Sequence, residues 1–135
     1  MTQAVLRNEI SDLTPDTGTN IEGRRQVAAA LGDVLADAFR LYINAQGLHW
    51  NVGPMFYSLH KLTEEQYQSI AASLDDIAER IRALGLPAPE SLKEIEKRSA
   101  ISDLPGDAEL KTRVQQMVTD YEKAVLRLAR VTTLA

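Results

Sequence analysis

Three long stretches of this chain repeat apolar residues at the spacing of an α-helix. They run from Val27 to Tyr42, from Leu59 to Leu84 and from Leu110 to Leu128, with apolar side chains three or four residues apart. Such a period places those side chains on one face of a helix, and no stretch alternates as a half-buried strand would. The pattern predicts an all-α protein built as an antiparallel bundle.

Capping residues and helix breakers predict where the helices begin and end. Thr19-x-x-Glu22 and Ser91-x-x-Glu94 are capping boxes, and Gly53-Pro54 separates the first two helices. The N-terminal residues 1–18 are predicted to form a tail, followed by one helical domain over residues 19–135. Within that domain we expect long helices over about 19–51, 54–84 and 107–134, and a short helix over about 91–99.

Composition excludes several classes of function. The chain of 135 residues suits one domain, and it has no cysteine, which excludes disulfides, thiolate metal sites and thiol catalysis. Its net charge of −4 argues against DNA binding through net basic charge. No apolar run reaches the length of a signal peptide or a membrane span, so we expect a cytoplasmic protein.

Residues 48–82 contain the side chains best suited to metal chemistry. Both histidines, His49 and His60, lie there with Trp50, the one tryptophan of the chain. Asp75 and Glu79 stand four residues apart, so a helix projects both carboxylates from the same face. A set of imidazoles and carboxylates suits iron, zinc or manganese.

Helix geometry limits how these residues can share a metal ion. His60 and Asp75 are separated by about 22 Å along one helix, whereas metal–ligand distances are about 2 Å. A shared site therefore requires two antiparallel copies of this helix, with His60 of one copy facing Asp75 and Glu79 of the other. It predicts a two-fold dimer.

Each of these residues also has a simpler interpretation without a metal. Asp75 and Glu79 would form a solvated face, His60 would be a core or interface histidine, and Trp50 would be a core aromatic residue. The cluster over residues 55–57 would be a hydrophobic staple for the second helix.

The joint spacing of these residues resembles the signature of the Dps family, the mini-ferritins. The resemblance covers about residues 20–130 and is most specific over residues 48–85. It is carried by four motifs: His49-Trp50-Asn51-Val52, Gly53-Pro54-x-Phe56-x-x-Leu59-His60, Glu64-Glu65-x-Tyr67 and Asp75-x-x-Ala78-Glu79-Arg80-Ile81.

The resemblance implies a ferritin-like four-helix bundle with a short helix between the second and third long helices. It also implies a homo-oligomeric shell of twelve subunits, with ferroxidase centres at two-fold interfaces. The centres would oxidise Fe(II) to Fe(III) with hydrogen peroxide, and the shell would store the iron and protect against oxidative stress. Zinc or manganese would compete with iron for the centres.

Carried over by motif, five residues of this chain would bind the metal. His49 and His60 of one subunit would act with Asp75 and Glu79 of its mate. Glu64 matches a position that holds a second iron or a bridging water, and Trp50 would lie beside the site.

Two departures from the family pattern leave alternative functions open. His49 and His60 lie 11 residues apart where the family usually has 12, and the chain ends at Ala135 without a fourth long helix. One alternative is a nucleoid-associated, DNA-coating protein, which the acidic N-terminal tail disfavours. The other is a non-catalytic bundle that has lost shell assembly.

Overall fold

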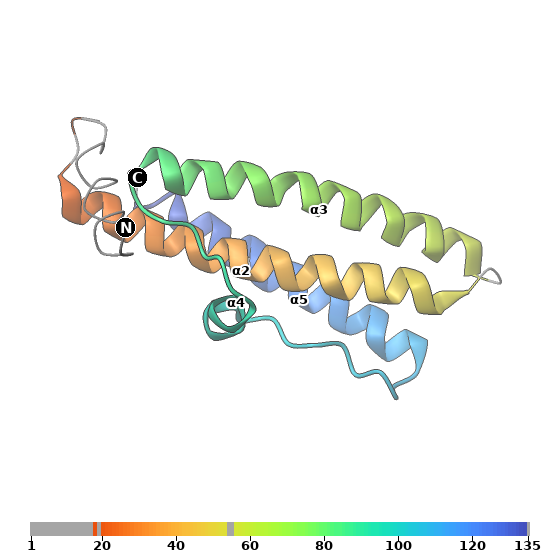
Figure 1. Cartoon of the computed structure of the whole chain (residues 1–135). Helices are drawn as coiled ribbons and strands as arrows, with labels where there is room; N and C mark the ends of the chain where they lie inside the picture. Colours follow the sequence, from red (N-terminus) through yellow and green to blue (C-terminus); the bar gives the residue numbers. More distant parts are fainter. Residues whose placement is uncertain (1–17, 19, 54–55, 135) are drawn as a thin grey trace.

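The computed structural model describes residues 18, 20–53 and 56–134 and is all-helical over them, which confirms the predicted fold class (Figure 1). The short helix α4 lies between the second and third long helices, as expected. The predicted N-terminal tail falls, apart from Gly18, outside the described residues. In chain order the helices are α2 (Ile21–Val52), α3 (Tyr57–Ala83), α4 (Leu92–Arg98) and α5 (Leu110–Val131).

Helix α2 is the centre of the bundle, because α3, α4 and α5 all pack against it. Helix α3 lies along α2, and α5 crosses behind α2 in this view; both run antiparallel to α2 (Figure 1). The segment that contains α4 passes along α2 and leads the chain back to the start of α5. This arrangement places the α2–α3 junction, where both histidines lie, at one end of the bundle.

Several of the predicted helix boundaries differ from the structure by one to three residues. Asn20 caps α2, and its side-chain oxygen accepts a hydrogen bond from the Gly23 nitrogen at 2.7 Å, so the N-cap predicted at Thr19 is wrong. Asn is among the strongest N-cap residues and outranks Thr. Helix α5 is three residues shorter than predicted at each end. At its start the Ala108 nitrogen donates to the Pro105 oxygen in a turn before Glu109, and beyond its end the Thr133 and Leu134 nitrogens donate to the Arg130 and Val131 oxygens in turns. The cap predicted at Ser91 is confirmed.

Apolar side chains form two clusters along α2. The first lies where α2, α3 and α5 meet, and the second lies where α2 packs against α3 and the segment that follows α3. Burial of one large aliphatic side chain contributes about 1.5–3 kcal/mol, so these clusters supply the main driving force for folding. Their buried members are Ala45, Leu48, Val52 and Met117 in the first, and Ala28, Leu35 and Ile81 in the second.

A buried carboxylate, Asp37, ties three segments together. It is 1% exposed, and its Oδ1 accepts hydrogen bonds from the Ala100 nitrogen at 2.8 Å, Arg127 Nη1 at 3.0 Å and Ser99 Oγ at 3.1 Å. Asp33, one turn earlier on α2, pairs with Arg127 and with Arg98. These bonds hold α5 and the end of α4 against α2.

Tyr121 packs against the first cluster, and its substitution tests how the buried hydroxyl affects stability. Its hydroxyl is buried without a hydrogen-bond partner among the described residues, and burial raises the pKa of Tyr121 to about 12. We expect Tyr121→Phe to match or exceed the wild-type stability at pH 7, by up to about 1 kcal/mol, because an unsatisfied hydroxyl is removed. The folded wild type holds this proton more tightly than the unfolded chain, so its stability should fall as pH rises from 10 to 12.

Urea unfolding of both proteins at pH 7 and across this alkaline range measures the difference. The stability advantage of Tyr121→Phe should widen with pH. A Phe variant that loses more than about 1 kcal/mol at pH 7 would show that the hydroxyl has a partner in solution.

Candidate metal centre

The structure brings the two histidines into direct contact at the α2–α3 junction. His49 lies in the last turn of α2 and is 9% exposed, and His60 lies in the first turns of α3 and is half-buried. Their rings stack with centroids 3.8 Å apart and planes inclined by 22°. The turn that is one residue shorter than the family pattern is therefore compatible with close approach of the two rings.

Reciprocal hydrogen bonds orient both rings. His49 Nδ1 donates to the His60 carbonyl at 2.8 Å, and His60 Nδ1 donates to the His49 carbonyl at 3.1 Å. A carbonyl oxygen only accepts, so each neutral ring carries its proton on Nδ1 and a free lone pair on Nε2. A backbone carbonyl on the other nitrogen is the usual partner of a metal-binding histidine. Both rings are in the tautomer that binds metal.

The same bonds join the two helices. The His49 carbonyl is among the last four of α2, which have no donor within their own helix, so the His60 ring acts as a cap for α2. Gly53 ends α2 with a φ of 74°, a conformation that favours glycine. The histidine pair thus has a structural role at this junction in addition to any metal chemistry.

Three neighbours on α3 surround the histidine pair. The Thr63 hydroxyl is buried and donates to the Leu59 and His60 carbonyls at 2.8 and 3.0 Å. The edge of the Tyr67 ring meets the His49 ring, with centroids 5.2 Å apart. Glu64 is half-buried one turn after His60, where Lys61 Nζ lies 3.6 Å from its carboxylate. Such a surface pair is weak, so Glu64 remains available to a cation.

Asp75 and Glu79 lie elsewhere on α3 and are exposed. No group of three histidine, aspartate or glutamate side chains that could hold a metal occurs among the described residues. One subunit therefore brings the two histidines together but leaves the two carboxylates apart from them. Exposure is also what the solvated-face interpretation predicts for these carboxylates.

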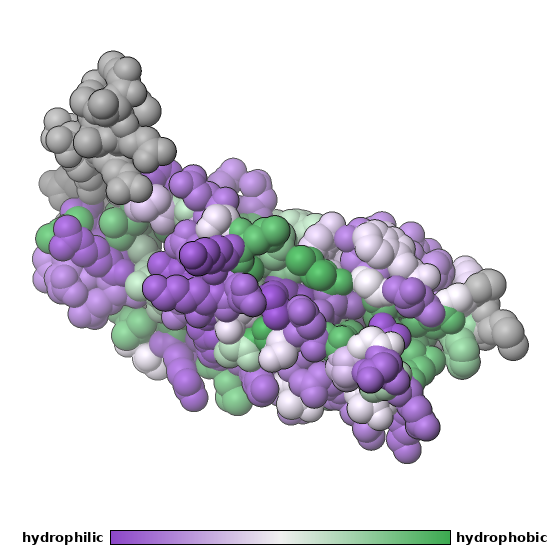
Figure 2. Space-filling model, turned by 60° about the horizontal axis from the view of Figure 1, so that its bottom comes forward, coloured by the Kyte–Doolittle hydropathy of each residue, from purple (hydrophilic) through white to green (hydrophobic). Residues whose placement is uncertain are grey.

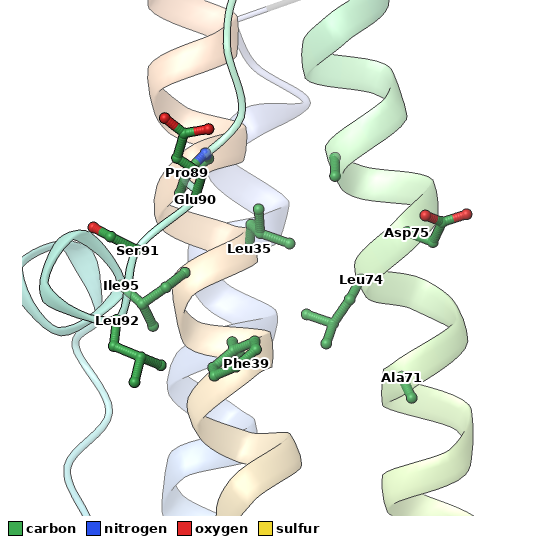
Figure 3. A pocket seen from close by; sticks show the side chains of 11 residues that line it. Leu35, Phe39, Ala71, Leu74, Asp75, Pro89, Glu90, Ser91, Leu92 and Ile95 are labelled. Carbon is green, nitrogen blue, oxygen red and sulfur yellow. The ribbon is translucent and has the colours of Figure 1, made fainter.

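An apolar groove of about 490 Å³ lies beside Asp75, between α2, α3 and the α4 segment. Leu35 and Leu74 point toward one another across it, whereas the Asp75 carboxylate projects away from them (Figure 3). Leu92 lines the groove and is 72% exposed.

The simpler interpretation of Trp50 was wrong. Trp50 is 69% exposed and is not a core residue. Phe56 and Tyr57 are 53% and 68% exposed, and Met55 falls outside the described residues, so the staple over residues 55–57 stays a prediction.

Exposed apolar side chains also remain on several helices. Hydrophobic patches lie between hydrophilic residues on the face that carries α4 (Figure 2). Patches of this kind are typical of surfaces that contact a partner. The large apolar side chains that are exposed on the helices include Ile43, Leu62, Leu92, Val118, Val125, Leu126 and Leu128.

Sequence reasoning assigned no role to Thr63 or Tyr67, although a signal was present. They follow His60 by three and seven residues, and a helical projection places all three on neighbouring positions of one face. Their contacts with the histidine pair depend on how α3 packs against α2, which the projection does not give.

Comparison with known proteins identifies the family. The family model described as ferritin-like domain matches residues 28–135 of the sequence. A DNA protection during starvation protein from Bacillus anthracis is 33% identical over 107 residues, which are 78% of this chain and 73% of the relative. The chain belongs to the Dps family of ferritin-like proteins.

The chain is also similar to other proteins. An uncharacterised low temperature-induced protein from Nostoc is 34% identical over 82% of this chain, and the match spans 63% of that relative's length. The crystal structure of a Dps protein from Vibrio cholerae, described as ferritin-like and diiron-carboxylate, is 27% identical with a TM-score of 0.82. The matched region covers 90% of this chain and 77% of the Vibrio cholerae chain. Among the described residues, no helix is long and apolar enough to cross a membrane.

Proposed function

We propose that this Dps-family chain is an iron-storing mini-ferritin that oxidises Fe(II) at centres shared between two subunits. One observation carries the proposal: the reciprocal Nδ1 bonds of His49 and His60 leave both Nε2 atoms free to bind metal. Fe(II) is the substrate, and zinc and manganese compete for the same nitrogen and oxygen donors.

The donor set suits both oxidation states of iron. His49, His60 and Glu64 of one subunit bind Fe(II), and Asp75 and Glu79 of the partner subunit complete the centre. Imidazole nitrogens hold Fe(II), and the hard carboxylate oxygens neutralise the charge that iron gains on oxidation. Hydrogen peroxide is the proposed oxidant: it takes one electron from each of two Fe(II) ions and two protons to give two waters.

The shared centre makes a homo-oligomer part of this proposal. His60 and Asp75 lie about 22 Å apart along α3, so two antiparallel copies are needed to complete each site. The exposed apolar groove beside Asp75 is compatible with a partner there. A twelve-subunit shell in the bacterial cytoplasm, which removes peroxide and stores ferric iron, is the assembly that family membership favours.

Substitution of His60 tests the proposed centre. In His60→Asn, the side-chain amide nitrogen takes the place of Nδ1 and can still donate to the His49 carbonyl, but the Nε2 ligand is lost. We expect near wild-type stability and a loss of Fe(II) oxidation of more than about tenfold. An anaerobic Fe(II) titration followed by stoichiometric peroxide, monitored by ferric absorbance, measures both binding and rate.

Two further variants complete this experiment. His60→Ala should lose both the ligand and the bond to the end of α2, and should be less stable than His60→Asn by about 1 kcal/mol. Glu96→Gln, on the exposed side of α4, should behave as the wild type. A wild-type oxidation rate in His60→Asn would remove His60 from the centre.

A further inference from the structure

A buried hydroxyl lies beside the histidine pair on α3. Thr63 is 1% exposed, and its Oγ1 donates to the Leu59 carbonyl at 2.8 Å and to the His60 carbonyl at 3.0 Å. A hydroxyl in a helix commonly bonds a carbonyl of the preceding turn, so these bonds alone are ordinary. The His60 carbonyl, however, is also the acceptor of the His49 ring. The Thr63 hydroxyl and the His49 ring therefore meet on one oxygen atom.

The His60 carbonyl is the group that fixes the tautomer of His49. His49 Nδ1 lies 2.8 Å from this oxygen, which can only accept, so the bond holds the ring proton on Nδ1. The His49 ring also contacts the rings of His60 and Tyr67, but such contacts are compatible with a proton on either nitrogen. The direction in which the carbonyl points therefore decides whether Nε2 of His49 keeps its lone pair.

Thr63 is placed to control that direction. A helix carbonyl that accepts a bond from outside the helical ladder tilts away from the helix axis. Helix α3 packs against α2, and Thr63 is buried in the packed face, so its hydroxyl approaches the His60 carbonyl on the side that faces α2. The His49 ring reaches the same oxygen from α2. Both bonds favour the same tilt of the carbonyl.

We propose that Thr63 is a positioning residue of the metal centre. Its hydroxyl holds the His60 carbonyl in the direction that accepts the Nδ1 proton of His49, and this keeps Nε2 of His49 free for Fe(II). The identity of the metal rests on the proposed function, whereas the effect of Thr63 on the His49 ring is a property of the metal-free protein. Thr63 acts through His60 and His49 and does not touch the metal.

Two substitutions of Thr63 separate positioning from packing. Thr63→Val keeps the branched shape of the buried side chain but removes the donor, so the His49 ring should lose its orientation while the packing is kept. Thr63→Ser removes a buried methyl group but keeps the donor, so it should be less stable and should still orient His49. Serine makes a bond of this kind elsewhere on α3, where the Ser73 hydroxyl donates to the Ser69 carbonyl at 3.1 Å.

A matched control lies on α5. The hydroxyl of Thr119 donates to the Gln115 carbonyl four residues earlier, at 3.2 Å, and Thr119 is exposed. Thr119→Val therefore makes the same chemical change at a hydroxyl of the same kind, away from the histidine pair. It should behave as the wild type in both measurements below.

Magic-angle-spinning NMR of the metal-free, full-length protein with ¹⁵N-labelled histidine reads the tautomers directly, whatever the size of the assembly. The chain has two histidines, and in the wild type both should carry the proton on Nδ1. His60→Asn keeps the backbone carbonyl of residue 60, so its spectrum assigns the His49 signals. In Thr63→Val we expect His49 to show the second tautomer as well, with the proton on Nε2.

An anaerobic titration with Fe(II) alone measures the consequence for binding. Substitution of a residue that orients a metal ligand typically lowers affinity by about 10- to 100-fold, so Thr63→Val should bind Fe(II) at least about tenfold more weakly. Thr63→Ser and Thr119→Val should keep the wild-type affinity. Urea unfolding of each variant verifies that it is folded under the conditions of the titration.

The two measurements distinguish failure of this inference from failure of the proposed function. The role of Thr63 is overturned if Thr63→Val keeps the single Nδ1 tautomer of His49 or the wild-type Fe(II) affinity, or if Thr63→Ser changes the His49 tautomer as Thr63→Val does. A wild type that binds no Fe(II) overturns the proposed function, and with it the link from Thr63 to metal binding. A change of tautomer and affinity in Thr63→Val, both restored in Thr63→Ser, supports the inference.

Discussion

Asp37→Ala is expected to lower the free energy of unfolding by about 3 kcal/mol, because it removes one partner of a buried ion pair. The Ala100 nitrogen and the Ser99 hydroxyl also lose their acceptor. Arg127 keeps Asp33 as a partner at 3.3 Å, which places the loss at the lower end of the range for buried pairs. Urea unfolding should show a lower midpoint at an unchanged slope.

A surface ion pair on the same helix provides the control. Arg40 pairs with Asp103, whose side chain is 81% exposed, so Asp103→Ala should cost less than about 1 kcal/mol. Asp37→Asn keeps an oxygen acceptor but loses the charge, and its stability should fall between the wild type and Asp37→Ala. A loss below about 1 kcal/mol in Asp37→Ala would show that the buried pair adds little to stability.

The class of fold and the order of helices could be predicted because both depend on local patterns. Apolar period, capping boxes and breakers act within a few residues, so they predicted an all-helical chain with a short helix between long ones. The errors occurred at helix ends, where Asn20 competes with Thr19 as a cap and the Pro105 turn delays α5. Such competition is decided by small differences in backbone hydrogen bonding.

The site was predictable only where one helix sets the geometry. The rise per residue predicted that His60 and Asp75 lie far apart on α3, and the structure finds no group of three ligands among its described residues. Ring stacking of His49 and His60 and the contact of Tyr67 depend on how α2 and α3 pack. The Asp37 network joins residues up to 90 positions apart, and no local pattern in the sequence indicates it.

Mixing of two inactive variants should restore activity if the centre is shared. One variant is His60→Asn, and the other carries Asp75→Asn and Glu79→Gln, which preserve side-chain shape. Each mixed dimer contains one centre with both substitutions and one wild-type centre. After joint unfolding and refolding at equal concentrations, about half of the dimers are mixed, so about one quarter of all centres should be active.

The proportion of restored activity distinguishes the possible geometries. Ferric absorbance after an anaerobic Fe(II) load and stoichiometric peroxide gives the number of active centres, and native mass spectrometry verifies the mixed dimers. Variants refolded separately and assayed together without subunit exchange should stay inactive, which controls for iron passing between proteins. If all ligands came from one chain, each chain in the mixture would still lack a ligand, and verified mixed dimers would show no gain. Recovery near one quarter would support the antiparallel arrangement, because it requires His60 and the carboxylate pair to act from different subunits.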